Sequence, residues 1–418
     1  MSPDPSGTGI NPLSAEFNKY WVVEPDRGRI RIILQDGREL EGPIMRSRER
    51  LPSEIAMAVF DWESWWVFNV TKRGGTVISE VYSPNAVDPR RGRRTVYLDQ
   101  NHWRSVAQTK VDITRIRNKA EASAAERVVK LATDLGVILP LSSAHMRETA
   151  PLYGDLRYNV GVAMASLSSG WQLRHPTAVW LMEIVELVGR VMGLAVPAYA
   201  ARDVVSLEPG ALTQQSHEIA MPRPSDIQLL IDAIGASSVV LEMLIDPESV
   251  KAIDLPQWVA ENQRITDLLS EVEEGPRRKR SMAYQEFWRA NFETVRQAGA
   301  LLGVSVEELY KLDGEAIEGY LDDLPMLAHV GGLHVTRYVD KSTRWKRNDL
   351  TDIMFLGCAA GYCDYVVAER HTGSQLRSIQ RARGVQTSVF SNLEELVGEL
   401  NTSGVKTASE RLESETSS

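Results

Sequence analysis

The stretch TVYLDQNHW, residues 95–103, decides the fold class of this chain. Its first four residues are β-branched or apolar, which is typical of a strand with both faces buried. Asp99 ends that strand, and the residues after it can start a helix. Polar side chains at the carboxyl ends of parallel strands line the ligand site of open α/β sheets. Asp99 is therefore the first candidate functional residue.

A second helix and strand follow further along the chain. The segment Ala120–Leu135 is rich in Ala, Glu and Lys, and its apolar residues recur at helical spacing. VILPLS, residues 137–142, then predicts a strand. Ser142 or Ser143 can cap a helix that carries Glu148, so this unit also places an acid just beyond a strand.

The segment NDLTDIMFLGCAAGYCDYVVAE, residues 348–369, provides a third unit. Asp349–Gly361 fits a helix and Asp364–Ala368 fits a buried strand. A further strand and helix are predicted over Gln386–Phe390 and Leu393–Leu400. Strands that alternate with helices indicate an α/β fold with a mainly parallel sheet.

The other segments differ in composition from these units. Short apolar runs with turn signals such as Asp36-Gly37 predict a small β unit near the N-terminus. The middle of the chain has apolar residues at helical spacing over 177–194, 225–244, 255–274 and 282–299. Both ends have little to bury. We predict a disordered tail over 1–14, a β-rich domain over 15–90, an α/β domain over 95–170 and 340–400, a helical insertion over 171–339, and a second disordered tail over 402–418.

Acidic residues recur at the ends of the predicted elements. Asp99 and Glu369 each end a strand, and Glu148 lies early in a helix that leaves another strand. Asp349 and Asp352 share one face at the start of a helix. Taken singly, each acid also fits a helix cap or a surface charge. Carboxylates gathered at one edge of a sheet repel each other, so their convergence calls for a cation. Oxygen ligands favour Mg²⁺ or Mn²⁺, and the two cysteines, inside an apolar segment, do not suggest zinc.

Three motifs, YLDQNHW, LPLSSAHMRET and NDLTDIMFLGCAAGYCDYVVAE, together resemble the motif set of PIN-like nucleases, in the large branch that carries insertions. The resemblance covers residues 95–170 and 340–400. It implies a three-layer α/β/α fold and a metal-dependent nuclease that acts on nucleic acid, with RNA ahead of DNA. The catalytic acids that it implies are Asp99, Glu148, Asp352 and Glu369.

The same resemblance implies the metal ligands. Asp99 matches the first acid of the family, Glu148 the second and Asp352 the third, with Asp349 as an accessory acid. Either Glu369 or Asp364 can be the fourth, because one follows the strand and the other precedes it. Asn101 matches a polar position that contacts the water shell of the metal.

Basic and polar residues beside these motifs are candidates for binding the substrate. The chain has a net charge of −9, which argues against a surface covered in phosphate-binding residues, but cations cluster next to the acids. His145 lies three residues before Glu148 on the same helical face and either contacts substrate or caps the helix. Trp103 and Trp345 either stack on bases or, as the favoured interpretation, pack in the core or at its rim. The predicted substrate-binding residues are Asn101, His145, Arg344, Lys346, Arg347, Arg370 and Arg377.

Two other functions fit parts of the pattern. A phosphohydrolase of the haloacid-dehalogenase type also uses Mg²⁺ and an Asp that ends a strand, but it needs a second Asp where this chain has Asn101. A PIN-like scaffold without catalysis could instead bind RNA or a partner protein. Dinucleotide and P-loop enzymes are disfavoured because neither GxGxxG nor GxxxxGK[ST] follows a strand.

The first residues, MSPDPSGTGINPLS, have no basic start and no apolar core, so they do not resemble a secretory signal. The longest apolar stretches are too short or too charged to span a bilayer. We therefore expect a cytoplasmic protein without membrane contact. The amphipathic helices of the insertion are the expected surface for a homo-oligomer or a protein partner.

Overall fold

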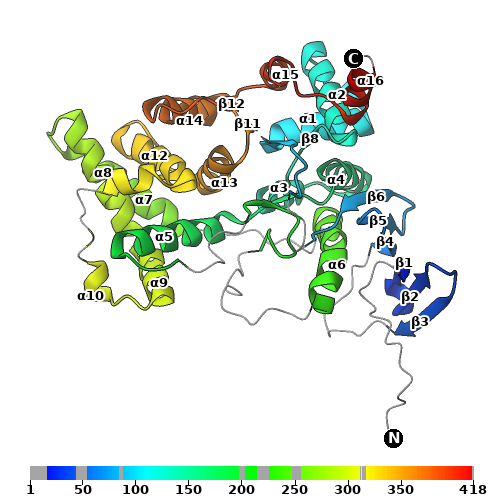
Figure 1. Ribbon diagram of the computed structural model, residues 1–418. Helices are drawn as coiled ribbons and strands as arrows, with labels where there is room; N and C mark the ends of the chain where they lie inside the picture. Colours follow the sequence, from blue (N-terminus) through cyan, green and yellow to red (C-terminus); the bar gives the residue numbers. More distant parts are fainter. Residues whose placement is uncertain are drawn as a thin grey trace, which may run out of the picture.

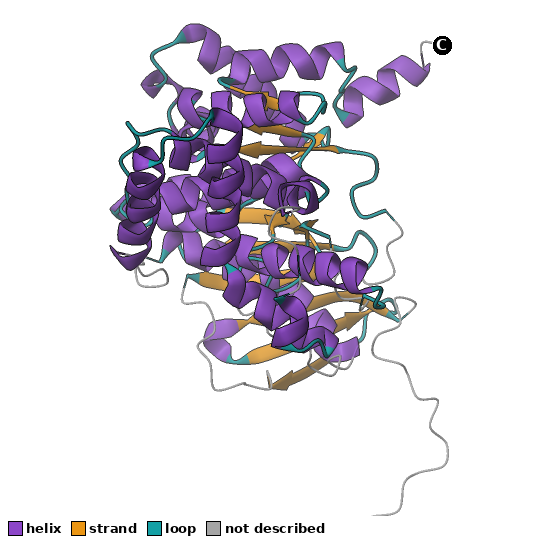
Figure 2. Cartoon of the chain, turned by 90° about the vertical axis from the view of Figure 1, so that its left-hand side faces the viewer, coloured by secondary structure: helices purple, strands orange, loops and turns teal. Residues whose placement is uncertain are grey.

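A computed structural model describes residues 17–43, 54–83, 88–196, 203–213, 226–246, 256–310, 312 and 317–416. Helices dominate, and most strands belong to two separate sheets (Figure 1, Figure 2). The tail predicted over 1–14 lies outside the described residues. In the described part of the chain, no helix combines the length and the apolar character that a membrane span needs.

The N-terminal sheet is antiparallel and has six strands in the order β3-β2-β1-β4-β5-β6. The hairpin predicted at Asp36-Gly37 is confirmed, because Gly37 adopts a positive φ of 85° between β2 and β3. Trp21, Phe60 and Trp62 pack edge to face in its core. The strand bounds are Asn18–Glu24 (β1), Arg29–Leu34 (β2), Glu39–Pro43 (β3), Ile55–Asp61 (β4), Trp66–Thr71 (β5) and Thr76–Glu80 (β6), with a short 3₁₀ turn at Pro25–Arg27.

The second sheet is parallel and has four strands in the order β12-β11-β7-β8. From β7 the chain moves one way to β8, and it later enters β11 and β12 on the other side. The strand order therefore reverses between β7 and β11, which is where ligands bind in such sheets. The bounds are Arg94–Leu98 (β7), Val137–Ile138 (β8), Tyr365–Val367 (β11) and Val389–Phe390 (β12). The predicted α/β class with a parallel sheet is confirmed.

Helices cover both faces of this parallel sheet, because its side chains alternate between two cores. Val96 and Leu98 pack into one core with α1 (Gln100–Val111), α2 (Lys119–Thr133), α4 (Gly154–Ser168) and α15 (Leu393–Thr402). Tyr97 packs into the other core with α5 (Pro176–Met192), α12 (Pro325–Val339), α13 (Asp349–Tyr362) and α14 (Arg370–Ala382). Two short elements, the 3₁₀ turn Ile113–Arg115 and α3 (Ser143–Thr149), complete this region.

The four helices predicted in the middle of the chain are present. Three of them are α5, α6 (Asp226–Ile245) and α7 (Pro256–Glu271), and the fourth is divided at Asn291 into α8 (Pro276–Ala290) and α9 (Phe292–Leu302). Two shorter helices, α10 (Val306–Leu309) and α11 (Ile317–Asp322), precede α12. A strand pair that the sequence did not indicate, β9 (Gln172–Leu173) with β10 (Val205–Ser206), also lies there.

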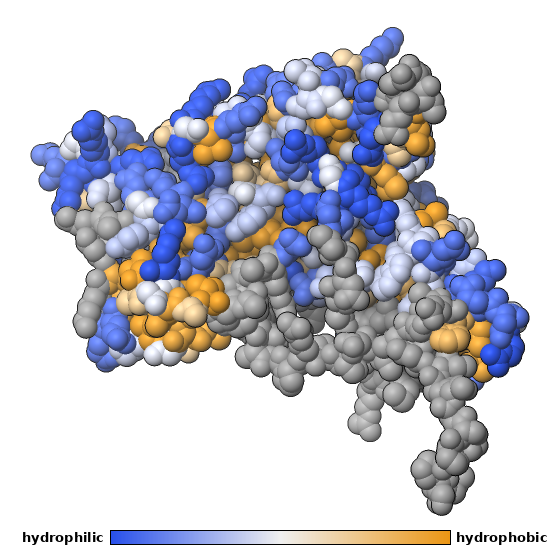
Figure 3. Space-filling view, viewed as in Figure 1, coloured by the Kyte–Doolittle hydropathy of each residue, from blue (hydrophilic) through white to orange (hydrophobic). Residues whose placement is uncertain are grey.

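Apolar side chains gather on the outer surface of this helical region. Figure 3 shows them over α5, α9 and α10, where the exposed apolar residues in or next to these helices are Val191, Leu194, Leu301, Val306 and Tyr310. Exposed apolar patches commonly mark contact surfaces. The partner or second copy expected at the helical insertion stays a prediction.

The C-terminal segment differs from the disordered tail predicted over 402–418. Residues Ala408–Thr416 form a helix, α16. Glu410 accepts hydrogen bonds from both terminal nitrogens of Arg127 on α2, and Ser409 donates to Asp134. Composition alone pointed to disorder, but these polar contacts with α2 attach the segment to the fold.

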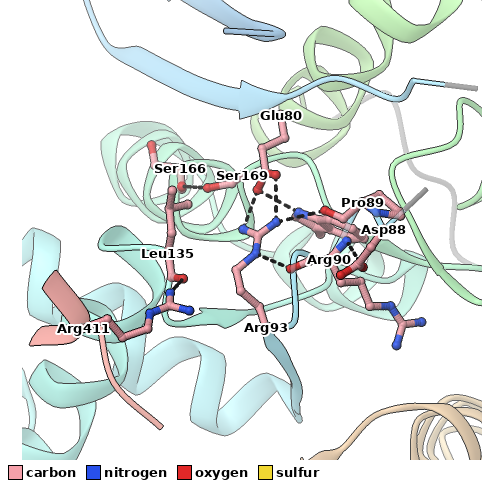
Figure 4. Close-up of polar contacts among 10 residues, drawn as sticks. Glu80, Asp88, Pro89, Arg90, Arg93, Leu135, Ser166, Ser169 and Arg411 are labelled. Carbon is pink, nitrogen blue, oxygen red and sulfur yellow. Dashed lines mark hydrogen bonds and ion pairs between the residues drawn. The ribbon is translucent and has the colours of Figure 1, made fainter. Parts of the chain in front are cut away.

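A buried ion pair joins the two sheets. Arg93, just before β7, donates two hydrogen bonds to Glu80 at the end of β6, over 2.7 and 2.8 Å. Figure 4 shows the Arg93 guanidinium between Glu80 and the backbone carbonyls of Pro89 and Arg90. The indole of Trp171 donates to the same carboxylate. Because both charges are almost wholly buried, their satisfied contacts fix the position of β7 against the N-terminal sheet.

A second buried acid fixes the far end of α13. Glu183 on α5 is 2% exposed and accepts hydrogen bonds from the backbone of Met326 and Leu327 in the first turn of α12. It also accepts one from the Tyr362 hydroxyl, in the last turn of α13. Burial raises the pKa of Glu183 to about 7, although these hydrogen bonds oppose the shift.

This shift predicts how stability depends on pH. The folded-state pKa of Glu183 lies above its ordinary value of 4.5. The group therefore favours the fold fully below about pH 4.5, and that contribution is lost as pH rises through about 7. We expect Glu183→Gln to flatten the pH profile of the unfolding free energy by on the order of 3 kcal/mol across this range. Urea denaturation at a series of pH values measures the effect.

Glu126→Gln is the control, because Glu126 is an exposed acid on α2 whose charge is not among the causes of the Glu183 shift. Its pH profile should overlay that of the unchanged protein. Equal profiles for both variants would show that Glu183 does not carry the dependence.

Candidate active site

Asp99 lies where the strand order reverses. It follows β7 directly and caps α1, where its Oδ1 accepts a hydrogen bond of 2.7 Å from the backbone of Gln100. Its own backbone N–H donates to the Val367 carbonyl of β11, and its Oδ2 accepts from the backbone N–H of Glu369 over 3.3 Å. Burial, followed by the negative charge of Glu369, raises the pKa of Asp99, and the bond from Gln100 opposes this rise.

Glu369 lies between β11 and α14, directly before the first residue of the helix, and its side chain is exposed. Asn101, in the first turn of α1, donates a hydrogen bond from Nδ2 to Oε1 of Glu369. This contact orients the Glu369 carboxylate, and the predicted roles of the exposed Asn101 in binding substrate or the water shell of a metal stay predictions. Asp99 and Glu369 therefore lie side by side at the carboxyl edge of the sheet.

His145 does not have the substrate-binding role predicted for it. The residue is 1% exposed, and its ring stacks on Tyr97. Its Nδ1 accepts from the backbone N–H of Ser142 over 3.0 Å, so Nε2 must carry the proton that it donates to the Leu98 carbonyl over 2.9 Å. Burial lowers the pKa of His145 to about 4, which keeps the ring neutral. His145 thus ties α3 to the last residue of β7.

Glu148 lies on α3, which His145 holds against the end of β7. Its side chain is exposed, yet protein atoms crowd around the carboxyl group. This crowding, together with the charges of Asp99 and Asp352, raises the pKa of Glu148 to about 7. Glu369 adds to the same shift. The negative charges of the other three acids therefore act on Glu148, as its position in the sequence predicts.

Asp352 and Asp349 differ in their surroundings although both lie in the first turn of α13. Asp349 accepts hydrogen bonds from the Arg337 guanidinium and from the backbone of Lys346. No such bond or ion pair is present for Asp352 within the described residues. Burial and the charges of Asp99, Asp349 and Glu369 raise the pKa of Asp352 to about 7. Asp352 thus belongs to the acidic cluster, whereas Asp349 mainly anchors α13 to α12.

Asp364 lies at the wrong end of its strand for the metal site predicted for it. It precedes β11 and accepts hydrogen bonds from the backbone and hydroxyl of Thr95 and from Arg94, at the start of β7. Because β7 and β11 are parallel, their starts lie at the opposite edge from Asp99 and Glu369. Of the two alternatives for the fourth acid, the geometry favours Glu369.

The acidic cluster, defined as Asp99, Glu148, Asp352 and Glu369, offers only oxygen donors. Hard cations such as Mg²⁺ and Mn²⁺ prefer this chemistry. In the described part of the chain, no three His, Cys, Asp or Glu side chains stand close enough to hold one ion. Binding one ion through three of these acids therefore requires movement of their side chains.

The basic residues predicted to bind substrate fall into two groups. Arg377 is partly buried and donates to the Val389 carbonyl and to Ser391, so it holds the end of β12, and its substrate-binding role stays a prediction. The others are exposed: Arg344, Lys346, Arg347 and Arg370. Lys346 and Arg347 line an open pocket with Pro256, Val259, Ala260, Gln263 and Trp345.

The two tryptophans considered for base stacking are in the core. Trp103 is fully buried. Trp345 is 6% exposed, packs against Trp258 and Tyr338, and has the Arg337 guanidinium over its ring. Neither offers a free ring face to a base.

Comparison with models of known protein families finds no match, and neither the curated proteins nor the solved structures give a significant match to this chain. The resemblance to PIN-like nucleases therefore stays a prediction from the motifs.

Burial of the Asp352 carboxyl group, together with the negative charges around it, predicts that one substitution at this position stabilises the protein. Because the folded-state pKa of Asp352 lies above its ordinary value of 3.8, its ionisation opposes folding, and this cost grows as pH rises through about 7. Asp352→Asn removes the charge. We expect it to raise the unfolding free energy at pH 8 in EDTA by on the order of 3 kcal/mol, measured by urea denaturation.

Asp349→Asn is the matched comparison on the same helical face. It should lower stability, because it leaves the Arg337 guanidinium, which is mostly buried, without its carboxylate. If both variants lose stability, the ionised Asp352 carboxylate does not oppose folding.

Proposed function

We propose that this chain is a metal-dependent nuclease with a PIN-like three-layer fold, which hydrolyses phosphodiester bonds in RNA. The observation that carries the proposal is the contact between Asp99 and Glu369 at the point where the strand order reverses. Glu148 and Asp352 come from two further helices, and their raised pKa values reflect the same negative charges. Few structural roles call for four acids at the ligand-binding edge of a sheet.

The acidic cluster would hold Mg²⁺ or Mn²⁺, and that cation would supply the Lewis acidity for attack of water on a phosphodiester. Hydrogen bonds and an ion pair within the chain hold these acids in position. Two hydrogen bonds hold the Asp99 carboxylate, and Asn101 orients Glu369. The ion pair of Arg337 with Asp349 fixes the first turn of α13, so that Asp352 faces the strands from a defined position.

The fold supports the PIN-like part of the proposal. Helices on both faces of a four-stranded parallel sheet give three layers. The preference for RNA comes from the motif resemblance alone. A dehalogenase-type phosphohydrolase is less well supported, because Asn101 occupies the position of its second acid and is engaged with Glu369.

The central prediction is divalent-dependent cleavage. Purified protein should cut labelled single-stranded RNA with Mn²⁺ or Mg²⁺ and not with EDTA. The variant with both Asp99→Asn and Asp352→Asn should lose activity by at least about 10³-fold, because it removes half of the acidic cluster. Gel analysis of the products, with a DNA strand of the same sequence in parallel, measures rate and preference.

Glu126→Gln is the control, since Glu126 is an exposed acid on α2 outside the acidic cluster. It should cleave at the unchanged rate. Cleavage that survives the double substitution would overturn the proposed site. RNA binding without cleavage under every condition would favour a non-catalytic binding module.

Cation binding is tested separately from cleavage. Mn²⁺ at about 100 times its dissociation constant should stabilise the folded protein by about 2.7 kcal/mol, because an ion bound only by the folded state shifts the unfolding equilibrium. The same addition should leave the double variant unchanged. A thermal shift series in Mn²⁺ measures this, and an equal shift in both proteins would place the ion elsewhere.

A further inference from the structure

The residue next to Glu148 on α3, Arg147, has a position that its sequence context did not reveal. Its guanidinium carbon lies 5.4 Å from the ring centroid of Phe355. Phe355 follows Asp352 by three residues, so both project from one face of α13. Arg147 therefore reaches from α3 across to α13, beside the acidic cluster.

Arg147 forms no ion pair with its chain neighbour Glu148, the acid whose charge acts on it. Its side chain is half-buried, and burial lowers its pKa, although the Glu148 charge opposes this. Within the described residues, Arg147 forms no ion pair and no hydrogen bond. Other arginines with little exposure have polar partners: Arg93 pairs with Glu80, Arg337 pairs with Asp349, and Arg157 donates to backbone carbonyls.

A guanidinium in this position is costly unless an anion completes its contacts. Contact with the face of an aromatic ring leaves the in-plane N–H groups of arginine able to donate. Those groups match two oxygens of a phosphate, which arginine binds with paired hydrogen bonds. A phosphodiester that approaches four acids is also repelled by them, and a neighbouring cation offsets that repulsion.

We propose that Arg147 binds the phosphate of the substrate next to the acidic cluster and is a further catalytic residue of the site. This inference rests on the proposed nuclease function, and it names the substrate group that Arg147 contacts. Lys346, which lines the open pocket before α13, would then contact phosphates further along the RNA.

The test combines binding and cleavage in two variants. Arg147→Met keeps a long apolar side chain against Phe355 but removes the charge, and Arg147→Lys keeps the charge without the paired donors. We expect Arg147→Met to weaken binding of labelled single-stranded RNA in EDTA by about 10–100-fold. The slope of log affinity against log salt should fall by about 0.7, because one phosphate contact is lost. Arg147→Lys should recover most of the slope and part of the affinity.

Arg104→Met, at an exposed arginine on α1, is the control and should change neither quantity by more than about twofold. Arg147→Met should leave the melting temperature and the Mn²⁺-induced shift unchanged. It should lower both the turnover number of cleavage and the affinity for RNA. If Arg147→Met destabilises the protein, Arg147→Lys decides the question. A role in packing alone predicts that Arg147→Lys binds RNA as tightly as the unchanged protein, whereas paired donation to phosphate predicts weaker binding.

The two proposals fail in different ways. Cleavage and a salt slope that are unchanged in a folded Arg147→Met protein would overturn the role of Arg147 and leave the nuclease intact. Absence of Mn²⁺-dependent cleavage by the unchanged protein would overturn the nuclease, and the salt slope would still decide whether Arg147 binds phosphate. Absence of RNA binding by the unchanged protein would overturn both.

Discussion

The parallel pairing of β7 with β11 is the constraint on which the candidate site depends. Leu98 lies opposite Val367, so the two strands end in step. The acids that follow them therefore share one edge. Asp99 caps α1, Glu369 directly precedes α14, and Asp352 lies in the first turn of α13. The positive ends of three helix dipoles thus face the acidic cluster and offset part of its repulsion.

Buried polar contacts keep α13 in place from both ends. At its start, Asp349 binds Arg337 on α12. At its end, Tyr362 donates to Glu183, which also receives the first N–H groups of α12. A helix attached at one end to α12 and at the other to Glu183 of α5, which itself binds α12, has little freedom to slide. The position of Asp352 is therefore set by contacts on either side of it, although Asp352 itself is not held.

Sequence patterns predicted the local elements well, because strand and helix signals are short-range. Asp99, Glu148, Asp352 and Glu369 were placed correctly at element ends for the same reason. The patterns did not reveal contacts between distant segments. His145 and Arg377 were predicted to bind substrate, but their side chains donate to backbone carbonyls of β7 and β12. Asp364 was ambiguous until the strand direction was known, and the pairing of Asp349 with Arg337 had no signal in the spacing.

The two acids that meet at the strand ends are 270 residues apart in the chain. During synthesis, Asp99 is made long before the segment that pairs with β7, and most of the helical region comes between them. Contacts of such sequence separation form slowly and late in folding. The edge of β7 next to Asp99 is consequently unpaired while the helices are made. A growing chain that has not yet reached Glu369 has no assembled acidic cluster, so any activity that the cluster supports is confined to the finished fold.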